Sequence, residues 1–151
     1  MTKRLTLWIC LVDGAHARII EPAASGIGYS LVRAFDSADA HHATHDLGTE
    51  RPPRTQESGY SGRHAIEPRS DLHRAEKIAF LDSFAAILAE SDKQGAFDQL
   101  MLFAPAAALH ELREALGPEI RGKIVLEAAK DLVKLPLHEL PAHIEAARAE
   151  G

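Results

Sequence analysis

The fold is decided by residues 5–21, whose sequence is LTLWICLVDGAHARIIE. Over residues 5–12 both alternating faces of an extended chain are apolar, which is typical of a central strand covered on both sides. The dipeptide Asp13-Gly14 then predicts a tight turn with positive φ angles, after which residues 15–21 return as a second strand. The stretch therefore predicts an antiparallel hairpin whose first strand lies in the middle of a sheet.

Apolar patterns further along the chain predict the order β-β-β-α-β-α-β-α. The expected strands are 5–12, 15–21, 29–35, 99–104 and 124–129, and the expected helices are about 70–90, 105–116 and 137–149. Right-handed crossovers between parallel strands give a mixed five-stranded sheet of order 3-2-1-4-5, with helices on both faces. We therefore expect one α/β domain over residues 1–151, similar in strand order to ribonuclease H.

The first helix carries the clearest local signals. Ser70 is expected as its N-cap and Asp71 as a negative charge in its first turn. From Leu72 to Leu88 apolar residues recur at helical spacing, which predicts one buried face, and Gly95 ends the helix. In the last helix, Pro141 is expected either to begin the regular part or to kink it.

Composition places the chain among soluble proteins. It has 151 residues, 46% of them hydrophobic and 26% charged, with a net charge of −5. The acidity argues against general nucleic-acid binding, and no apolar run is long enough to cross a membrane. Residues 1–17 resemble a signal peptide, but Asp13-Gly14 ends the apolar run with a hairpin signal. The single Cys10 suits a reducing compartment and is expected to be a buried, inert thiol. We expect a cytoplasmic protein.

A long polar stretch, residues 46–77, interrupts the scaffold and forms most of an expected loop over 36–70 between the third strand and the first helix. From Arg51 to Arg74 it contains five arginines and three acidic residues, which gives a local charge of +2. Ligand sites of open α/β sheets favour the edge formed by the carboxyl ends of the strands. We therefore expect the stretch to fold over an edge that carries Asp13 and Asp131.

Two readings of this stretch remain open. The glycines of Ser58-Gly59-Tyr60-Ser61-Gly62-Arg63-His64 would let the backbone approach a ligand, and Arg63 with His64 suits phosphate binding or proton donation; alternatively, this is a flexible surface loop. The arginines suit a polyanion, or they pair with neighbouring acids in solvent. The candidate partner-binding residues are Asp13, Arg51, Arg54, Gly59, Gly62, Arg63, His64, Arg69 and Asp131.

Metal and cofactor sites are not predicted. The histidines His41, His42 and His45, even when taken together with His16, lack the spacing of known zinc sites. A ribonuclease H-type nuclease needs several carboxylates that converge on metal, and the first strand is apolar. A Ser/His/Asp hydrolase is poorly supported because no nucleophile-elbow pattern occurs. No catalytic residue is assigned.

Several blocks resemble one family over nearly the whole chain. They are Leu7–Ile19 (LWICLVDGAHARI), Ser61–Asp71 (SGRHAIEPRSD), Phe97–Leu100 (FDQL), Lys130–Leu132 (KDL) and Leu135-Pro136. The chain resembles bacterial proteins described as required for attachment to host cells. That family looks similar in fold to the central domain of archaeal and eukaryotic peptide-chain release factors, in which a Gly-Gly-Gln loop precedes a long helix. Here no glutamine follows Gly59 and Gly62, so the catalytic residue is not carried over.

Three functions follow as hypotheses. The first is a non-enzymatic binding protein that engages an unknown macromolecular partner through the Gly/Arg/His loop. The second, implied by the release-factor resemblance, is a factor associated with the ribosome or tRNA. The third is a small hydrolase that uses Arg63 and His64 with Asp13 or Asp131.

Overall fold

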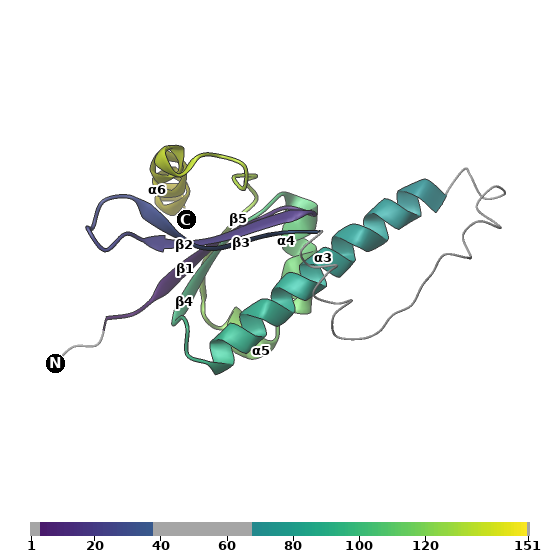
Figure 1. Cartoon of the computed structure of the whole chain (residues 1–151), viewed down its shortest axis with the longest axis horizontal. Coiled ribbons are helices and arrows are strands. Elements are labelled where there is room, and N and C mark those ends of the chain that lie inside the picture. Colours follow the sequence, from purple (N-terminus) through teal and green to yellow (C-terminus); the bar gives the residue numbers. More distant parts are fainter. Residues whose placement is uncertain (1–3, 38–67, 151) are drawn as a thin grey trace.

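The structure is a computed structural model that describes residues 4–37 and 68–150, and the side chains of the second range from residue 71 onward. A five-stranded sheet is flanked by helices (Figure 1). The elements in chain order are β1 (Leu7–Val12), β2 (His16–Pro22), β3 (Tyr29–Asp36), α3 (Pro68–Lys93), β4 (Gln99–Phe103), α4 (Ala106–Ala115), α5 (Pro118–Arg121), β5 (Ile124–Ala128), the 3₁₀ helix η1 (Leu137–Glu139) and α6 (Leu140–Glu150).

The sheet has the predicted order, β3-β2-β1-β4-β5. β1 pairs antiparallel with β2 and parallel with β4, and β4 pairs parallel with β5. β3 pairs antiparallel with β2 and therefore runs in the same direction as β1. The carboxyl ends of four strands consequently share one edge, as the sequence predicted.

Alternating residues of β1 enter two separate cores, which explains why both of its faces are apolar. Trp8, Cys10 and Val12 belong to the core on the side of α3 and α4, where the Trp8 and Phe97 rings lie 5.1 Å apart. Ile9 and Leu11 belong to the core that α6 covers on the opposite face. Figure 1 shows α3, α4 and α5 on one side of the sheet and α6 on the other. The prediction of helices on both faces is confirmed.

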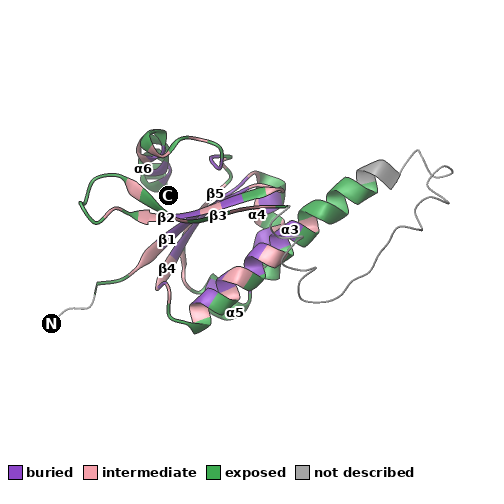
Figure 2. Cartoon of the chain, viewed as in Figure 1, coloured by how far each residue is buried: buried purple, intermediate pink, exposed green. Residues whose placement is uncertain are grey.

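Helix α3 is longer than predicted and projects beyond the sheet. Its 26 residues correspond to about 39 Å at the usual rise per residue. It begins at Pro68, so the prediction that Ser70 is the N-cap is wrong: Ser70 lies inside the helix. Residues 71–77 are all exposed, Leu72 at 57%, and the first buried side chain is Phe80 (Figure 2). The helix ends before Gly95, whose φ of 71° suits glycine.

The remaining helices differ from expectation mainly at prolines. Gly117 and Pro118 end α4 as predicted, but Pro118 also begins the short helix α5, which was not predicted. The expected last helix is divided into η1 and α6, and Pro141 is the second residue of α6, where a proline costs no internal hydrogen bond. Within the described part of the chain, no helix is long and apolar enough to cross a membrane.

Candidate functional site

A cleft of about 900 Å³ opens at the edge of the sheet where β1 ends. This edge includes the topological switch point between β1 and β4, from which the chain winds in opposite directions across the sheet. The cleft is lined by the β1–β2 turn, the start of β2, α3, the start of α4 and the segment after β5. The lining residues include Asp13, His16, Arg74, Lys77, Pro105 and Lys134.

The turn that enters the cleft is built by the side chain of Asp13. Asp13 Oδ1 accepts hydrogen bonds from the backbone N–H groups of Ala15, at 2.8 Å, and His16, at 2.6 Å. The Asp13 N–H donates to the His16 carbonyl at 2.9 Å, which closes a three-residue connection. The predicted positive φ at Gly14 is wrong. The positive φ was expected for a two-residue hairpin turn. The observed connection has three residues and is held by the Asp13 carboxylate, so it does not require that conformation.

The absence of a side chain at Gly14 nevertheless has a steric consequence. A Cβ placed on Gly14 would lie 2.7 Å from Cγ and 2.9 Å from Cδ of Lys77, closer than carbon atoms tolerate. The missing side chain thus allows the aliphatic part of Lys77 to cross the β1–β2 turn. This close approach brings the Lys77 side chain from α3 to the end of β1, at the cleft.

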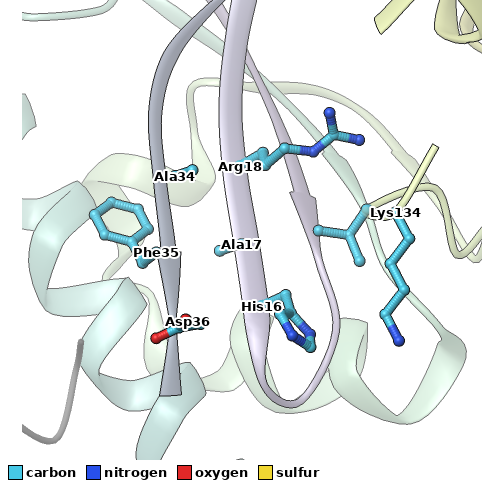
Figure 3. Close-up of a pocket in the computed structure, with 8 residues that line it drawn as sticks. His16, Ala17, Arg18, Ala34, Phe35, Asp36 and Lys134 are labelled. Carbon is cyan, nitrogen blue, oxygen red and sulfur yellow. The ribbon is translucent and has the colours of Figure 1, made fainter. Parts of the chain in front are cut away.

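His16 lies at the boundary of two cavities. Its Nδ1 atom is 3.4 Å from Asp13 Oδ1, and its side chain is 46% exposed. His16 and Lys134 line both the main cleft and a neighbouring cavity of about 490 Å³. Figure 3 shows the side chains of His16 and Arg18 extending from β2 toward the segment that carries Lys134.

Arg18 holds that segment in place. Its Nη2 atom donates to the carbonyl oxygens of Leu132, at 3.3 Å, and Leu135, at 2.5 Å. Burial lowers the pKa of the Arg18 guanidinium below its ordinary value. Its Nε atom is buried and makes no hydrogen bond. Arg18 therefore ties β2 to the residues on either side of Lys134, and the position of that lysine depends on it.

The charges of the cleft are mixed. Arg74, Lys77 and Lys134 line it with Asp13, Glu76 and Glu111, in addition to His16 and His73. Within the described residues, Arg74, Lys77 and Lys134 make no ion pair or hydrogen bond. No carboxylate of the described residues therefore neutralises these three charges by direct contact.

Only some of the predicted site residues lie at the cleft. Asp13 lines the cleft, whereas Asp131 is exposed on the segment after β5 and is outside the cleft lining. Arg69 lies in the first turn of α3, with its side chain outside the description. The other candidates lie outside the described residues, as do the three clustered histidines: Arg51, Arg54, Gly59, Gly62, Arg63, His64, His41, His42 and His45. The predicted hydrolase arrangement therefore stays a prediction.

The sequence did not predict that Lys77 and Lys134 line the cleft, and His16 was considered only as a metal ligand. His73 and Lys77 are four residues apart and share a helix face with Leu81, a spacing that was visible in the sequence. Nothing in the sequence near Lys134 indicates that it reaches the same cleft. Among the described residues, no three His, Cys, Asp or Glu side chains gather as metal ligands would.

These features define an open α/β protein with a cleft, lined by both charged and apolar residues, at the switch point of its sheet. A model of the family described as "Protein required for attachment to host cells" matches residues 8–144. The chain belongs to this family, and the predicted resemblance is confirmed. No curated protein matches the chain significantly. The relation to release factors stays a prediction.

Proposed function

We propose that this member of the host-attachment family is a non-enzymatic binding protein that engages a macromolecular partner at the cleft edge. The observation that carries the proposal is the continuity between the cleft and the projecting turns of α3. Residues 71–77 are all exposed, and four of them also line the cleft: His73, Arg74, Glu76 and Lys77. A small molecule would contact the cleft alone, whereas a macromolecule can bind both surfaces together.

We propose that the polar loop contributes to the same surface. It connects β3 to α3; Ser37 lines the cleft at the β3 end, and the cleft-lining residues of α3 begin at His73, five residues after the helix starts. We therefore retain Arg51, Arg54, Gly59, Gly62, Arg63, His64, Arg69 and Asp131 as proposed partner-binding residues. Asp13 contributes by shaping the turn, because its carboxylate is engaged by two backbone N–H groups.

Attachment of the source organism to host cells tests the proposal. A strain that lacks the gene is complemented with the wild-type protein, with Arg74→Gln/Lys77→Gln, or with Lys93→Gln. Lys77 and Lys93 are exposed lysines at opposite parts of the same helix, so the last variant is a matched control for loss of charge. We expect attachment to fall with the double variant and to persist with the control.

Equal attachment with all three proteins at equal abundance would reject the cleft edge as the binding surface. Cell fractionation of the same strains tests the proposed cytoplasmic location. Protein found mainly in the cytoplasm would mean that its contribution to attachment is indirect, whereas protein at the cell surface would contradict that location.

A second candidate is a factor associated with the ribosome or tRNA. The observation that favours it is that the arginine-rich loop leads directly into the projecting end of α3, comparable to the loop and long helix of release factors. Co-sedimentation with ribosomes at low salt, weakened by added salt and by Arg54→Ala/Arg63→Ala, would support it. Absence of co-sedimentation at low salt would eliminate this candidate.

A further inference from the structure

We infer that the cleft binds an oxyanion, the phosphate or carboxylate group of its partner, between His16, Lys134 and the start of α4. The inference rests on the proposed binding function and deepens it by naming the chemical group recognised there. It is carried by the convergence of basic side chains from separate elements on one cavity.

Three of these side chains come from different parts of the chain. His16 is the first residue of β2, Lys77 belongs to α3, and Lys134 follows β5. Each position is fixed by a separate contact: His16 by the Asp13 turn, Lys77 by packing on Gly14, and Lys134 by the Arg18 hydrogen bonds on either side of it. Figure 3 shows His16 and Lys134 on the same side of β2. These contacts bring basic residues from three separate elements to the lining of one cavity.

Among the described residues, Lys77 and Lys134 make no ion pair, unlike several other basic residues there. Lys123 pairs with Asp92, and Arg113 pairs with Glu127 at 3.2 Å. In the described ranges, no carboxylate makes an ion pair with Lys77 or Lys134. An anion beside them would break none of the ion pairs formed among the described residues.

The carboxylates of the cleft restrict where the anion lies. Asp13 accepts two backbone N–H groups and lies beside His16, so its charge is partly satisfied. Glu76 neighbours Lys77 on α3, and Glu111 lies in the second turn of α4. An anion is repelled from the Glu111 end and is favoured near Pro105, where α4 begins.

The start of α4 is compatible with this position. Pro105 provides no side-chain cap, the first turn contains no acidic residue, and Ala107 and Ala108 line the cleft. The first N–H groups of a helix lack partners within the helix and can donate to an anion. They supplement the basic side chains that define the site.

Nuclear magnetic resonance titration of the full chain tests the inference. Inorganic phosphate and acetate are added separately at constant ionic strength, with chloride as the reference ion, while the amide signals of Gly14, Ala107 and Ala108 are followed. We expect saturable shifts with at least one oxyanion; phosphate alone would indicate a phosphate-bearing partner, and acetate alone a carboxylate-bearing partner.

Two variants then locate the site. A hydrogen bond to an ionised group contributes enough that Lys134→Gln should weaken binding roughly tenfold. Lys93→Gln, with the same loss of charge at the far end of α3, should change affinity less than about twofold because exposed distant charges are screened. Thermal unfolding of each variant confirms that it is folded.

Failure of both anions to give saturable shifts, or equal affinities for wild type and Lys134→Gln, would overturn the inference. If attachment is nevertheless lost with Arg74→Gln/Lys77→Gln, the proposed function stands while the oxyanion site does not. The two proposals can therefore fail separately.

Discussion

Leu72 and Leu88 offer a matched test of how α3 lies on the sheet, because both follow the apolar periodicity of one helix. Leu88 is completely buried in the core shared with β1 and β4, whereas Leu72 is 57% exposed on the projecting turns. Truncation of a buried leucine to alanine removes its transfer free energy and leaves a cavity. We expect Leu88→Ala to lower the free energy of unfolding by about 3 kcal/mol, within the usual range for this change. Leu72→Ala should change it by less than about 0.5 kcal/mol.

Urea denaturation of both variants measures these differences at equal protein concentration. For a chain of about 150 residues, a loss of about 3 kcal/mol lowers the melting temperature by roughly 6–12 °C. Intrinsic helix propensity does not confuse the comparison, because leucine and alanine differ by only a few tenths of a kcal/mol. A cost above about 1 kcal/mol for Leu72→Ala would show that the first turns of α3 pack against other residues. A cost below about 1 kcal/mol for Leu88→Ala would refute its place in the core.

Three further predictions concern residues around β1. Burial raises the pKa of the Cys10 thiol, so alkylating reagents at pH 8 should modify it in urea and leave the folded protein unmodified, as mass spectrometry would show. In the unfolded chain the thiol ionises near its ordinary pKa of 9.0, whereas in the folded protein it keeps its proton, so the free energy of unfolding should fall as pH rises above 9.0. Cys10→Ala should reduce that fall. An unchanged dependence of the free energy of unfolding on pH in this variant would contradict the prediction. Asp13→Ala leaves two N–H groups of the turn without their acceptor and should cost about 1–2 kcal/mol in urea denaturation, whereas Asp13→Asn keeps an acceptor oxygen and should cost less. Equal costs for the two would argue against the turn geometry. Gly14→Ala should destabilise the wild type by about 1 kcal/mol through its collision with Cγ and Cδ of Lys77, and cost less in a Lys77→Ala background, where only the 3.2 Å contact with Cβ remains. Additive effects in that double-mutant cycle would mean that the collision is relieved elsewhere.

The sheet was predictable because its central strand meets the same environment on both sides. In β1, Trp8 and Cys10 face one core while Ile9 and Leu11 face the other, so every position requires an apolar side chain. A continuous apolar run of this kind identifies a doubly covered strand without knowledge of its neighbours. The order of the other strands then follows from the handedness of the crossovers.

Errors arose where a local pattern depends on what lies next to it. Helical periodicity indicates which face of α3 is apolar, but not how far the sheet extends beneath that face. Leu72 therefore matched the pattern and is exposed. Ser70 has the chemistry of an N-cap, yet the helix begins two residues earlier, at Pro68, a residue suited to the first helical position. In each case the residue type indicated the kind of local structure, but its place in the sequence did not indicate burial or the exact start of the helix.

The site was only partly predictable for the same reason. The sequence placed Asp13 at the correct edge because a carboxylate directly after a central strand must lie there. It could not indicate that Lys77 and Lys134, which are 57 residues apart, line one cleft. Their convergence depends on the absence of a side chain at Gly14 and on the carbonyl groups that bind Arg18.

This dependence has a consequence for the function of Asp13. Its carboxylate holds the turn through the N–H groups of Ala15 and His16, and the same turn supports Lys77 and positions His16. A change at Asp13 therefore alters the cleft even if Asp13 never contacts the partner. Lys134 is more informative about binding, because its ammonium group makes no hydrogen bond or ion pair within the described chain. Loss of partner binding on substitution of Lys134, with the stability unchanged, would assign recognition to the cleft itself.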